Sequence, residues 1–223
     1  MLEIKIQRAL RHHFRTSFRG GHAAGWVERE VAVGSVIPDL VAIRSRSKNL
    51  TRTQLSYFEA SIVAALLAIS PGRQALLPLA NRLQSEPKIL LRSLSSLIRR
   101  GLVDCLGHQY GAVLRSWPSA EIVAVEAKVV AWRAALRQAL GYLAFADKVL
   151  IALPQSVAIR SEVRTACRAE GVGLMAYAAS SGLTRMIAPR QSQAGHSSER
   201  LRLLAYGVGL RASSLTTRAN QVA

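Results

Sequence analysis

The apolar run KVLIALP, residues Lys148–Pro154, constrains the fold more than any other segment of this chain. A nearly continuous apolar run of this length is typical of a strand covered on both faces, as in a parallel or mixed sheet. Helical periodicity precedes it in Trp132–Phe145 and follows it in Ser156–Gly171, whose first and last residues suit helix caps. Further strands are predicted at Glu121–Val129 and Gly173–Ala178, the latter as the last strand. This alternation predicts an α/β sandwich with a mixed central sheet.

The first part of the chain predicts one helix and two strands of the same sandwich. Apolar residues recur at helical spacing over Leu2–Thr16. Residues Trp26–Ile43 alternate β-branched with other residues on both sides of Gly34-Ser35, which predicts two strands joined by a tight turn there.

A separate block interrupts the sandwich. Residues Arg44–Thr53 are polar and basic and are interpreted as a linker. Three helical stripes follow, the third beginning near Pro87, and Leu102–Leu114 predicts a hairpin around Gly107-His108. The predicted organisation is a first core part (1–50), an inserted domain (51–117), a second core part (118–189) and a C-terminal tail (190–223). The tail is expected to be partly disordered, with one candidate helix over Ser198–Tyr206.

The charge balance points to a polyanionic partner. The 223 residues include 30 Lys and Arg against 13 Asp and Glu, a formal net charge of +17. Lys and Arg side chains that neutralise phosphates release condensed counterions, which favours binding to a polyanion. Charge alone does not distinguish DNA from RNA or from an anionic membrane. The apolar stretch Ser61–Ile69 is too short to span a bilayer. Cys105 and Cys167 have no zinc spacing, and we expect both to be buried thiols. These features predict a soluble cytoplasmic protein that does not bind membranes.

Three polar residues of the predicted strands form the candidate catalytic centre. Asp39 lies in the second strand, and Glu126 and Lys128 lie two positions apart in an otherwise apolar strand, hence on one face. Asp39 and Glu126 would hold Mg²⁺, with Mn²⁺ as a substitute. Lys128 would either position the attacking water or stabilise the pentavalent phosphorus centre of a phosphodiester. For Glu126 and Lys128 alone, a solvated ion pair at a strand edge is the simpler interpretation, since the E-x-K triplet is common.

The wider pattern resembles the PD-(D/E)XK nuclease superfamily. Pro38-Asp39 followed by Glu126-Ala127-Lys128 is similar to that family's motif, and the order helix, three strands, helix, strand is similar to its core. Gln138 and Tyr142 resemble the Q-x-x-x-Y motif of the RecB-like branch, which implies that both lie beside the active site. The resemblance implies a restriction-endonuclease-like fold and one more acidic metal ligand. The candidates for that ligand are Glu3, which we favour, Glu28 and Glu30.

The inserted block resembles a winged-helix domain in its order of three helices and a hairpin. Its third helix would be the recognition helix in the major groove. Side chains that suit phosphates and base edges lie opposite its leucine stripe; they are Lys88, Arg92, Ser95, Ser96 and Arg99. The hairpin tip at His108 would be the wing, with Arg115 nearby. A protein-binding winged helix, or a helical insert whose basic face is only solvated, is the alternative.

Together these features predict a Mg²⁺-dependent DNA nuclease directed to double-stranded DNA by an inserted winged helix. The alternative is a DNA-binding protein or transcriptional regulator without catalysis, in which the nuclease-like core is degenerate. A weaker alternative is an RNA-processing factor. The sequence leaves open whether the chain forms a homodimer, as nucleases that cut both strands commonly do.

Overall fold

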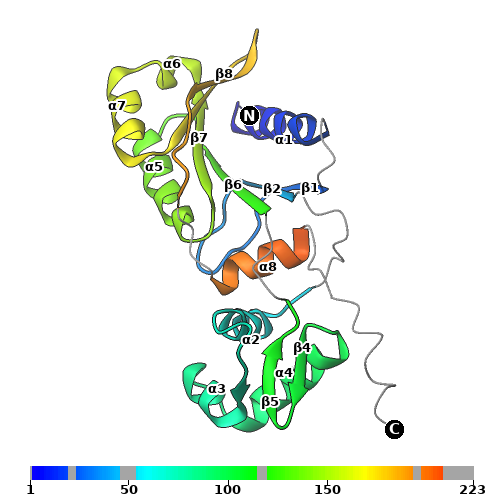
Figure 1. Ribbon diagram of the computed structural model, residues 1–223. Helices are drawn as coiled ribbons and strands as arrows, with labels where there is room; N and C mark the ends of the chain where they lie inside the picture. The colour runs from blue at the N-terminus through cyan, green and yellow to red at the C-terminus, as the bar shows by residue number, and fades with distance from the viewer. Residues whose placement is uncertain (1, 20–23, 46–53, 115–119, 193–196, 208–223) are drawn as a thin grey trace. The chain divides into compact units, whose positions relative to one another are not determined.

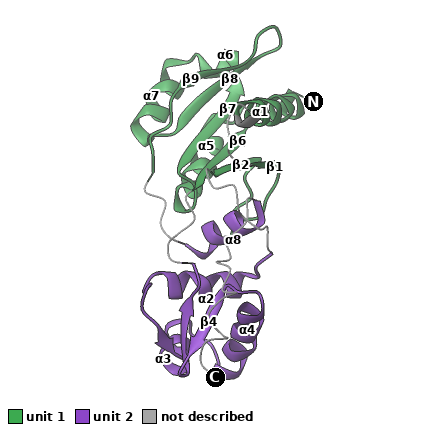
Figure 2. Ribbon diagram, turned by 45° about the vertical axis from the view of Figure 1, so that its right-hand side comes forward, with its two compact units in different colours: residues 1–48, 119–195 green, residues 49–118, 196–223 purple. Residues whose placement is uncertain are grey.

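The computed structural model describes residues 2–19, 24–45, 54–114, 120–192 and 197–207 (Figure 1). The chain divides into two compact units, which are coloured separately in Figure 2. Unit 1 comprises residues 1–48 and 119–195, and unit 2 comprises residues 49–118 and 196–223. Unit 2 therefore draws on the middle of the chain and on its C-terminal part.

Unit 1 is built on a mixed six-stranded sheet with the order β1-β2-β6-β7-β8-β9. The central strands β6, β7 and β8 are parallel, while β1, β2 and β9 run antiparallel to their neighbours. The strands are β1 (Ala24–Glu28), β2 (Leu40–Ser45), β6 (Ala120–Ala127), β7 (Lys148–Pro154), β8 (Gly173–Ala178) and β9 (Gly182–Ile187). The predicted α/β class with a mixed sheet is confirmed, and the KVLIALP run is the largely buried strand β7.

Helices cover both faces of this sheet. Helix α1 (Leu2–Arg19) lies on one face, and α5 (Trp132–Gly141) and α7 (Ser161–Glu170) lie on the other (Figure 1). An apolar cluster joins α1 to the sheet; its buried members include Ile6, Leu10, Phe14, Val123, Val125 and Ala127. Successive side chains of a strand point to opposite faces, so Glu126 points toward the α5 side. Side chains on opposite faces of the sheet can approach one another only where β6 ends and the sheet no longer separates them.

The loop before β2 differs from the predicted tight hairpin. β1 and β2 pair antiparallel as predicted, but the turn at Gly34-Ser35 closes only an isolated bridge between Val33 and Val36. Residues 29–39 therefore form a loop, and Asp39 is its last residue, immediately before β2. Helix α1 also runs three residues beyond the predicted end at Thr16.

Two predictions for the second half of unit 1 were wrong. The single helix predicted over Ser156–Gly171 is two helices, α6 (Gln155–Ala158) and α7, and Ser156 lies inside α6 instead of capping a helix. Gly171 does end α7, in the left-handed region at φ 71°, where glycine has no steric penalty. β8 is not the last strand, because β9 pairs with it at the sheet edge. None of the side chains of β9 is fully buried, so it lacks the clean alternation that marks a strand in sequence.

Unit 2 packs helices against a small antiparallel sheet of order β3-β5-β4. Its elements are α2 (Tyr57–Leu67), β3 (Gln74–Ala75), α3 (Leu76–Arg82), α4 (Pro87–Arg99), β4 (Val103–Leu106), β5 (Gln109–Ala112) and α8 (Ser198–Gly207). The three predicted helices and the hairpin around Gly107-His108 are confirmed. The core includes the fully buried leucines Leu66, Leu79, Leu90, Leu94 and Leu97.

Helix α8 belongs to unit 2 and is not part of a separate tail. Its side chains Leu201 and Ala205 are fully buried in the unit 2 core. The Tyr57 hydroxyl donates a hydrogen bond of 2.9 Å to Glu199, which ties the start of α8 to α2. The predicted tail thus contains a packed helix at the position of the candidate helix, and the expectation of disorder for residues 208–223 lies outside the described residues.

Two expectations from composition concern membranes and cysteines. Within the described part of the chain, no helix is both long and apolar enough to cross a membrane. Cys167 is buried as predicted, whereas Cys105 on β4 is exposed. The prediction for Cys105 failed because burial falls along β4, from the buried Val103 to the exposed Cys105 and Leu106.

Candidate active site

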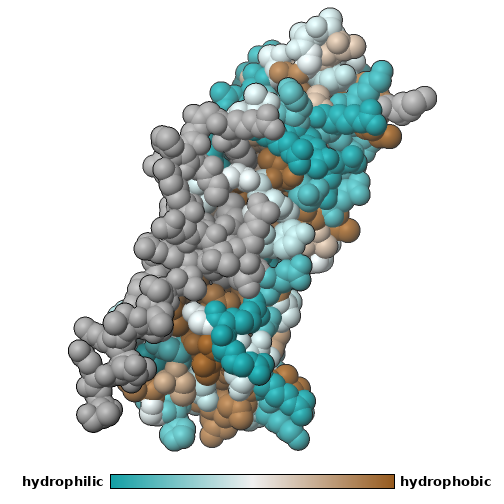
Figure 3. All heavy atoms as spheres, turned by 90° about the vertical axis from the view of Figure 1, so that its right-hand side faces the viewer, coloured by the Kyte–Doolittle hydropathy of each residue, from teal (hydrophilic) through white to brown (hydrophobic). Residues whose placement is uncertain are grey.

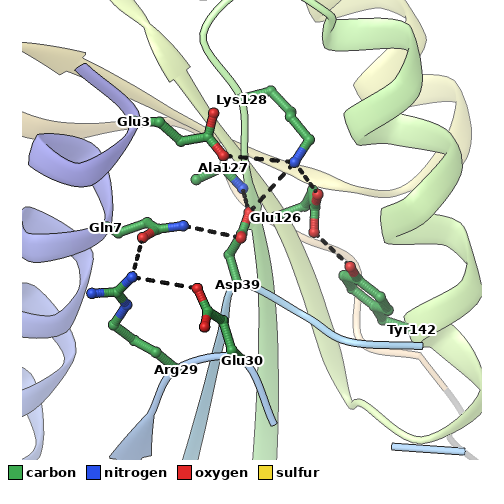
Figure 4. Close-up of polar contacts among 9 residues, drawn as sticks. All are labelled: Glu3, Gln7, Arg29, Glu30, Asp39, Glu126, Ala127, Lys128 and Tyr142. Atoms are coloured by element: carbon green, nitrogen blue, oxygen red, sulfur yellow. Dashed lines mark hydrogen bonds and ion pairs between the residues drawn. The ribbon is translucent and has the colours of Figure 1, made fainter. Parts of the chain in front are cut away.

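Five polar side chains from four segments converge where β6 ends (Figure 4). β2 and β6 are antiparallel neighbours with Leu40 opposite Val125, so the residue before β2 lies beside the residues that end β6. Helix α1 reaches the same place from one face, and the 3-10 turn η1 (Tyr142–Ala144) reaches it from the other. The five residues, called the acidic cluster below, are Glu3, Asp39, Glu126, Lys128 and Tyr142.

Asp39 is held in one orientation by hydrogen bonds to both carboxylate oxygens. The side-chain amide of Gln7 donates to Oδ1 at 3.0 Å, and the backbone N–H of Ala127 donates to Oδ2 at 2.7 Å. A carboxylate has about four lone-pair sites, so each oxygen can still bind a cation. The two donors come from α1 and from β6, which fixes Asp39 relative to both elements.

Glu126 is the buried member of the acidic cluster, with 2% of its surface exposed. Tyr142 donates a hydrogen bond of 2.5 Å to its Oε2, and the Lys128 ammonium lies 2.9 Å from its Oε1. A buried charge is costly unless it is paired and hydrogen-bonded, and both oxygens of Glu126 have such a partner. Burial, followed by the hydrogen bond to Glu126, raises the pKa of Tyr142 well above its usual range, so its hydroxyl stays a donor.

Lys128 links all three carboxylates of the cluster. Its Nζ lies 3.7 Å from Oε1 of Glu3 and 4.0 Å from Oδ2 of Asp39, in addition to the close contact with Glu126. Burial alone would lower the pKa of Lys128, but the hydrogen bond and charge of Glu126, with Asp39 and Glu3, raise it. The lysine is therefore an ammonium. The side chain of Glu3 is 40% exposed, so the cluster opens to solvent on the α1 side.

The cluster has an excess of acidic groups, three carboxyls around one ammonium. Burial raises the pKa of Asp39, the charges of Glu126 and Glu3 raise it further, and the Ala127 N–H and Lys128 offset part of this effect. A bound cation would relieve the repulsion between Asp39 and Glu126. This repulsion is the electrostatic reason to consider a metal ion here.

The donors of the cluster fit Mg²⁺. All are carboxylate oxygens, the ligands that Mg²⁺ prefers, and Mg²⁺ commonly takes one or two carboxylates while water and substrate phosphate complete its shell. Within the described residues, no group of three or more His, Cys, Asp and Glu side chains is arranged to hold a metal ion. Asp39 and Glu126 are the two carboxylates that would contact a cation, and water and substrate would have to complete its shell.

Two residues of the site were missed in the sequence. Gln7 is 5% exposed on α1 and shares a helix face with Glu3, four residues earlier. A guanidinium nitrogen of Arg29 donates to the Gln7 side-chain oxygen, and another contact of 3.5 Å joins Arg29 to Glu30 (Figure 4). No feature of the sequence pointed to Gln7, because it directly follows Ile6 and lies beside the predicted apolar stripe, where a glutamine is usually solvated.

The remaining residues predicted for this site lie outside the acidic cluster. Gln138 is exposed on α5 and is not among the residues that contact the cluster. Tyr142, four residues later and just beyond the end of α5 at Gly141, is 1% exposed and contacts Glu126, so the two side chains differ in exposure. Glu28 accepts a hydrogen bond from the Arg29 backbone, and Glu30 contacts Arg29. Of the three candidate acids, only Glu3 reaches Lys128.

Unit 2 presents a basic helix face on α4. Helix geometry of about 100° per residue places Lys88, Arg92, Ser95 and Arg99 opposite the buried Leu90, Leu94 and Leu97, and all four are exposed. Ser96 lies off this face and donates to Glu59 at 3.1 Å. His108 is exposed at the hairpin tip with φ 61°. Arg115 lies outside the described residues.

Comparisons with known proteins add no relative to this description. No protein-family model, curated protein or solved structure matches the chain. The acidic cluster and the basic face of α4 are therefore interpreted from their own geometry and chemistry.

Proposed function

We propose that unit 1 is a Mg²⁺-dependent DNA nuclease core of the PD-(D/E)XK type with a restriction-endonuclease-like fold. The observation that carries this proposal is the convergence of Asp39 and Glu126 around the Lys128 ammonium, where β2 begins and the neighbouring β6 ends. Two carboxylates for a divalent cation and one ammonium for a phosphate are the groups that phosphodiester hydrolysis needs.

Each residue of the cluster has a role that follows from its contacts. Asp39 and Glu126 would hold the cation, with Glu3 beside them. When bound, the cation would act as a Lewis acid toward the phosphodiester. Lys128 is partly exposed and would face the phosphate to stabilise its developing charge. Gln7 and Tyr142 keep the two carboxylates oriented and do not themselves contact substrate.

We further propose that unit 2 is a winged-helix domain that binds double-stranded DNA. The exposed face of α4, with Lys88, Arg92 and Arg99, would enter the major groove, and the hairpin tip at His108 would contact the backbone. The Ser95 hydroxyl on this face donates to the Leu91 carbonyl oxygen at 2.9 Å and could only accept a hydrogen bond from DNA. Ser96 is withdrawn from this list because its hydroxyl is directed to Glu59. Because both units belong to one chain, DNA bound by unit 2 would be held at high effective concentration near unit 1.

The test of this function is cleavage of plasmid and of duplex, single-stranded and RNA oligonucleotides in Mg²⁺, in Mn²⁺ and in a chelator. The proposal predicts metal-dependent cleavage of DNA that Lys128→Ala reduces by about 10²-fold or more. Arg168→Gln, which changes an exposed cation on α7, is the matched control and should cleave like the wild type. Cleavage by Lys128→Ala at the wild-type rate would reject the assigned role.

A second candidate function is DNA binding without catalysis, which the net charge of +17 and the exposed basic face of α4 favour. It predicts tight, salt-sensitive DNA binding with no strand cut in any metal. Under that outcome, Asp39→Ala would bind DNA as tightly as the wild type, and unit 1 would serve as a scaffold.

A further inference from the structure

Arg29 begins the loop between β1 and β2 and reaches the acidic cluster through another side chain. An arginine at the surface is ordinary in this chain, since the face drawn in Figure 3 is largely hydrophilic where it is described. Arg29 differs because its side chain is only 33% exposed. One of its terminal nitrogens donates to Oε1 of Gln7 and lies 3.5 Å from Glu30, while its buried Nε has no partner (Figure 4). The guanidinium is therefore placed for the contacts of its terminal nitrogen.

The Gln7 side chain has one orientation that satisfies both of its neighbours. A guanidinium has donors and no acceptor, so only the amide oxygen of Gln7 can face Arg29. The amide nitrogen then faces Asp39, and it donates to Oδ1 at 3.0 Å. A carboxylate accepts hydrogen bonds, so Asp39 requires the same orientation. Arg29 thus sets the direction of the hydrogen bond that Asp39 receives.

Burial makes Gln7 depend on Arg29. Gln7 is 5% exposed, so water does not readily replace a lost partner. Without the guanidinium, the buried Oε1 would be an acceptor without a donor, which is destabilising. The side chain would then turn toward solvent or turn its oxygen toward Asp39, and either movement removes the hydrogen bond to Oδ1. The donor to Asp39 is therefore maintained from the opposite end of the amide.

The backbone ties Arg29 to Asp39 by a second route. The N–H of Glu30, the next residue, donates to the backbone carbonyl oxygen of Asp39 at 3.4 Å. Glu30 has a φ of 53°, a left-handed conformation that is uncommon for a residue with a side chain. The Arg29 N–H in turn donates to a carboxylate oxygen of Glu28 at 3.2 Å. These bonds close the loop of residues 29–39 at its base and hold the arginine beside the segment that carries Asp39.

We propose that Arg29 is a positioning residue for the candidate metal site: it fixes the amide of Gln7, which in turn fixes the carboxylate of Asp39. The inference rests on the proposed nuclease function, because cation binding is what gives Asp39 its role. With Oδ1 held by Gln7 and Oδ2 by the Ala127 N–H, the remaining lone pairs of Asp39 keep a constant direction toward the cation. Lys128 differs from Arg29, because its ammonium lies 4.0 Å from Asp39 itself.

The charge of Arg29 and its contact with Gln7 act on cation binding in opposite directions. A positive charge near a bound cation repels it, so loss of the charge alone would strengthen binding. Loss of the orientation of Gln7 and Asp39 weakens binding, commonly by about 10–100-fold for partners that hold a ligand. The sign of the change in cation affinity therefore separates the two roles of Arg29.

The first test is calorimetric titration of Mn²⁺ into the full chain and its variants. Arg29→Met should bind about tenfold more weakly than the wild type, although it lacks a repelling charge. Arg29→Lys keeps the charge and a donor and should recover most of the affinity. In the Gln7→Leu background, Arg29→Met should cause no further loss, because the two residues act in series.

The matched control for this titration is Arg168→Met, which removes an exposed cation from α7 and should bind Mn²⁺ like the wild type. Unchanged or tighter binding by Arg29→Met would overturn the proposal, because only the charge would then matter. An equal loss with and without Gln7 would also overturn it, because Arg29 would then not act through the amide.

The second test uses the metal-free protein and does not depend on cation binding. NMR follows the exchange of the Gln7 side-chain amide protons with water, and the signals are assigned by their absence from Gln7→Leu. The proposal predicts slow exchange in the wild type and, in Arg29→Met, exchange approaching that of the exposed Gln138 amide. Protection of Gln7 that persists in Arg29→Met would overturn the proposal.

The same spectra show whether each variant is folded, and Arg29→Gln replaces Arg29→Met if the latter is not. If the wild type binds no cation, the nuclease proposal fails, and the Gln7 amide signals alone decide the role of Arg29.

Discussion

The side-chain amide of Gln7 donates a hydrogen bond of 3.0 Å to Asp39, from a helix that lies 32 residues earlier in the chain. Arg29 in turn donates to the Gln7 oxygen, so a chain of polar contacts leads from the β1–β2 loop to the candidate metal ligand. Partners of this kind, which hold a ligand in place, commonly change metal affinity or activity by about 10–100-fold.

Replacement of Gln7 by leucine should weaken divalent-cation binding while leaving the fold intact. The variant removes the donor to Asp39 and frees one carboxylate oxygen to rotate, so we expect about a tenfold loss of Mn²⁺ affinity by calorimetry. High metal concentration should restore most of the cleavage rate. Gln138→Leu is the matched control, because Gln138 is exposed on α5. Equal cation affinity in the two variants would argue against a positioning role for Gln7.

Tyr142→Phe should destabilise unit 1. The change removes the 2.5 Å hydrogen bond to Oε2 of Glu126, and a carboxylate oxygen that is nearly inaccessible to water would lose its donor. The expected loss is about 1–3 kcal/mol in the free energy of unfolding, measured with urea. Tyr177→Phe on β8 removes the same hydroxyl from a half-buried position and should change stability by less than about 0.5 kcal/mol. A loss in Tyr142→Phe no larger than in this control would show that the hydrogen bond is weak.

Glu59 should make the stability of unit 2 depend on pH. Burial alone would raise its pKa, but the Ser56 N–H, the Arg100 guanidinium and the Ser96 hydroxyl together hold the pKa below the usual range. A carboxyl with a depressed folded pKa contributes stability above its unfolded pKa of about 4.3, and this contribution is lost as the pH falls through the folded pKa. Unfolding of unit 2 should therefore become easier below about pH 4.3.

Glu59→Gln tests this assignment. Glutamine retains the capping box with Ser56 but loses the charge that pairs with Arg100 at 2.9 Å. We expect a loss of about 1–2 kcal/mol at pH 7 and a flatter acid limb in urea unfolding. The control is Glu86→Gln, since Glu86 is an exposed N-cap without a side-chain capping bond. The same pH dependence in wild type and Glu59→Gln would assign the acid sensitivity to another group.

The basic face of α4 should contribute to DNA affinity through phosphates. Arg92→Gln and Arg99→Gln should each lower the salt slope of duplex binding by about 1, and the double variant by about 2. Fluorescence anisotropy over a range of salt concentrations measures the slope. Arg100→Gln is a useful contrast because its guanidinium pairs with Glu59, so it should affect stability more than the slope. Slopes unaffected by both α4 variants would remove unit 2 from the DNA interface.

The sequence predicted the parts of the site that depend on strand order. Apolar patterning marks the strands that carry Asp39 and Glu126, so the sequence could place the two carboxylates on neighbouring strands. The structure pairs these strands as β2 and β6. Local signals of this kind also predicted the helices of unit 2, where buried leucines recur at helical spacing.

The parts that could not be predicted depend on tertiary contacts or on local geometry. Gln7 is recognisable only by what it touches, since one glutamine on an amphipathic helix is usually solvated. Helical spacing placed Gln138 beside Tyr142, but spacing does not report that Gln138 is exposed while Tyr142 is buried. Helix α8 was assigned to the tail because its partner α2 lies about 140 residues earlier in the chain, and no local pattern reports such a contact.

The most direct measurement of the central claim is calorimetric titration of Mg²⁺ and Mn²⁺ into the metal-free protein and into Glu126→Gln and Asp39→Ala. If the two carboxylates share a cation, the wild type binds it with a defined stoichiometry, and each variant binds it at least about tenfold more weakly while remaining folded. Wild-type affinity in both variants, or no binding by the wild type, would contradict the account.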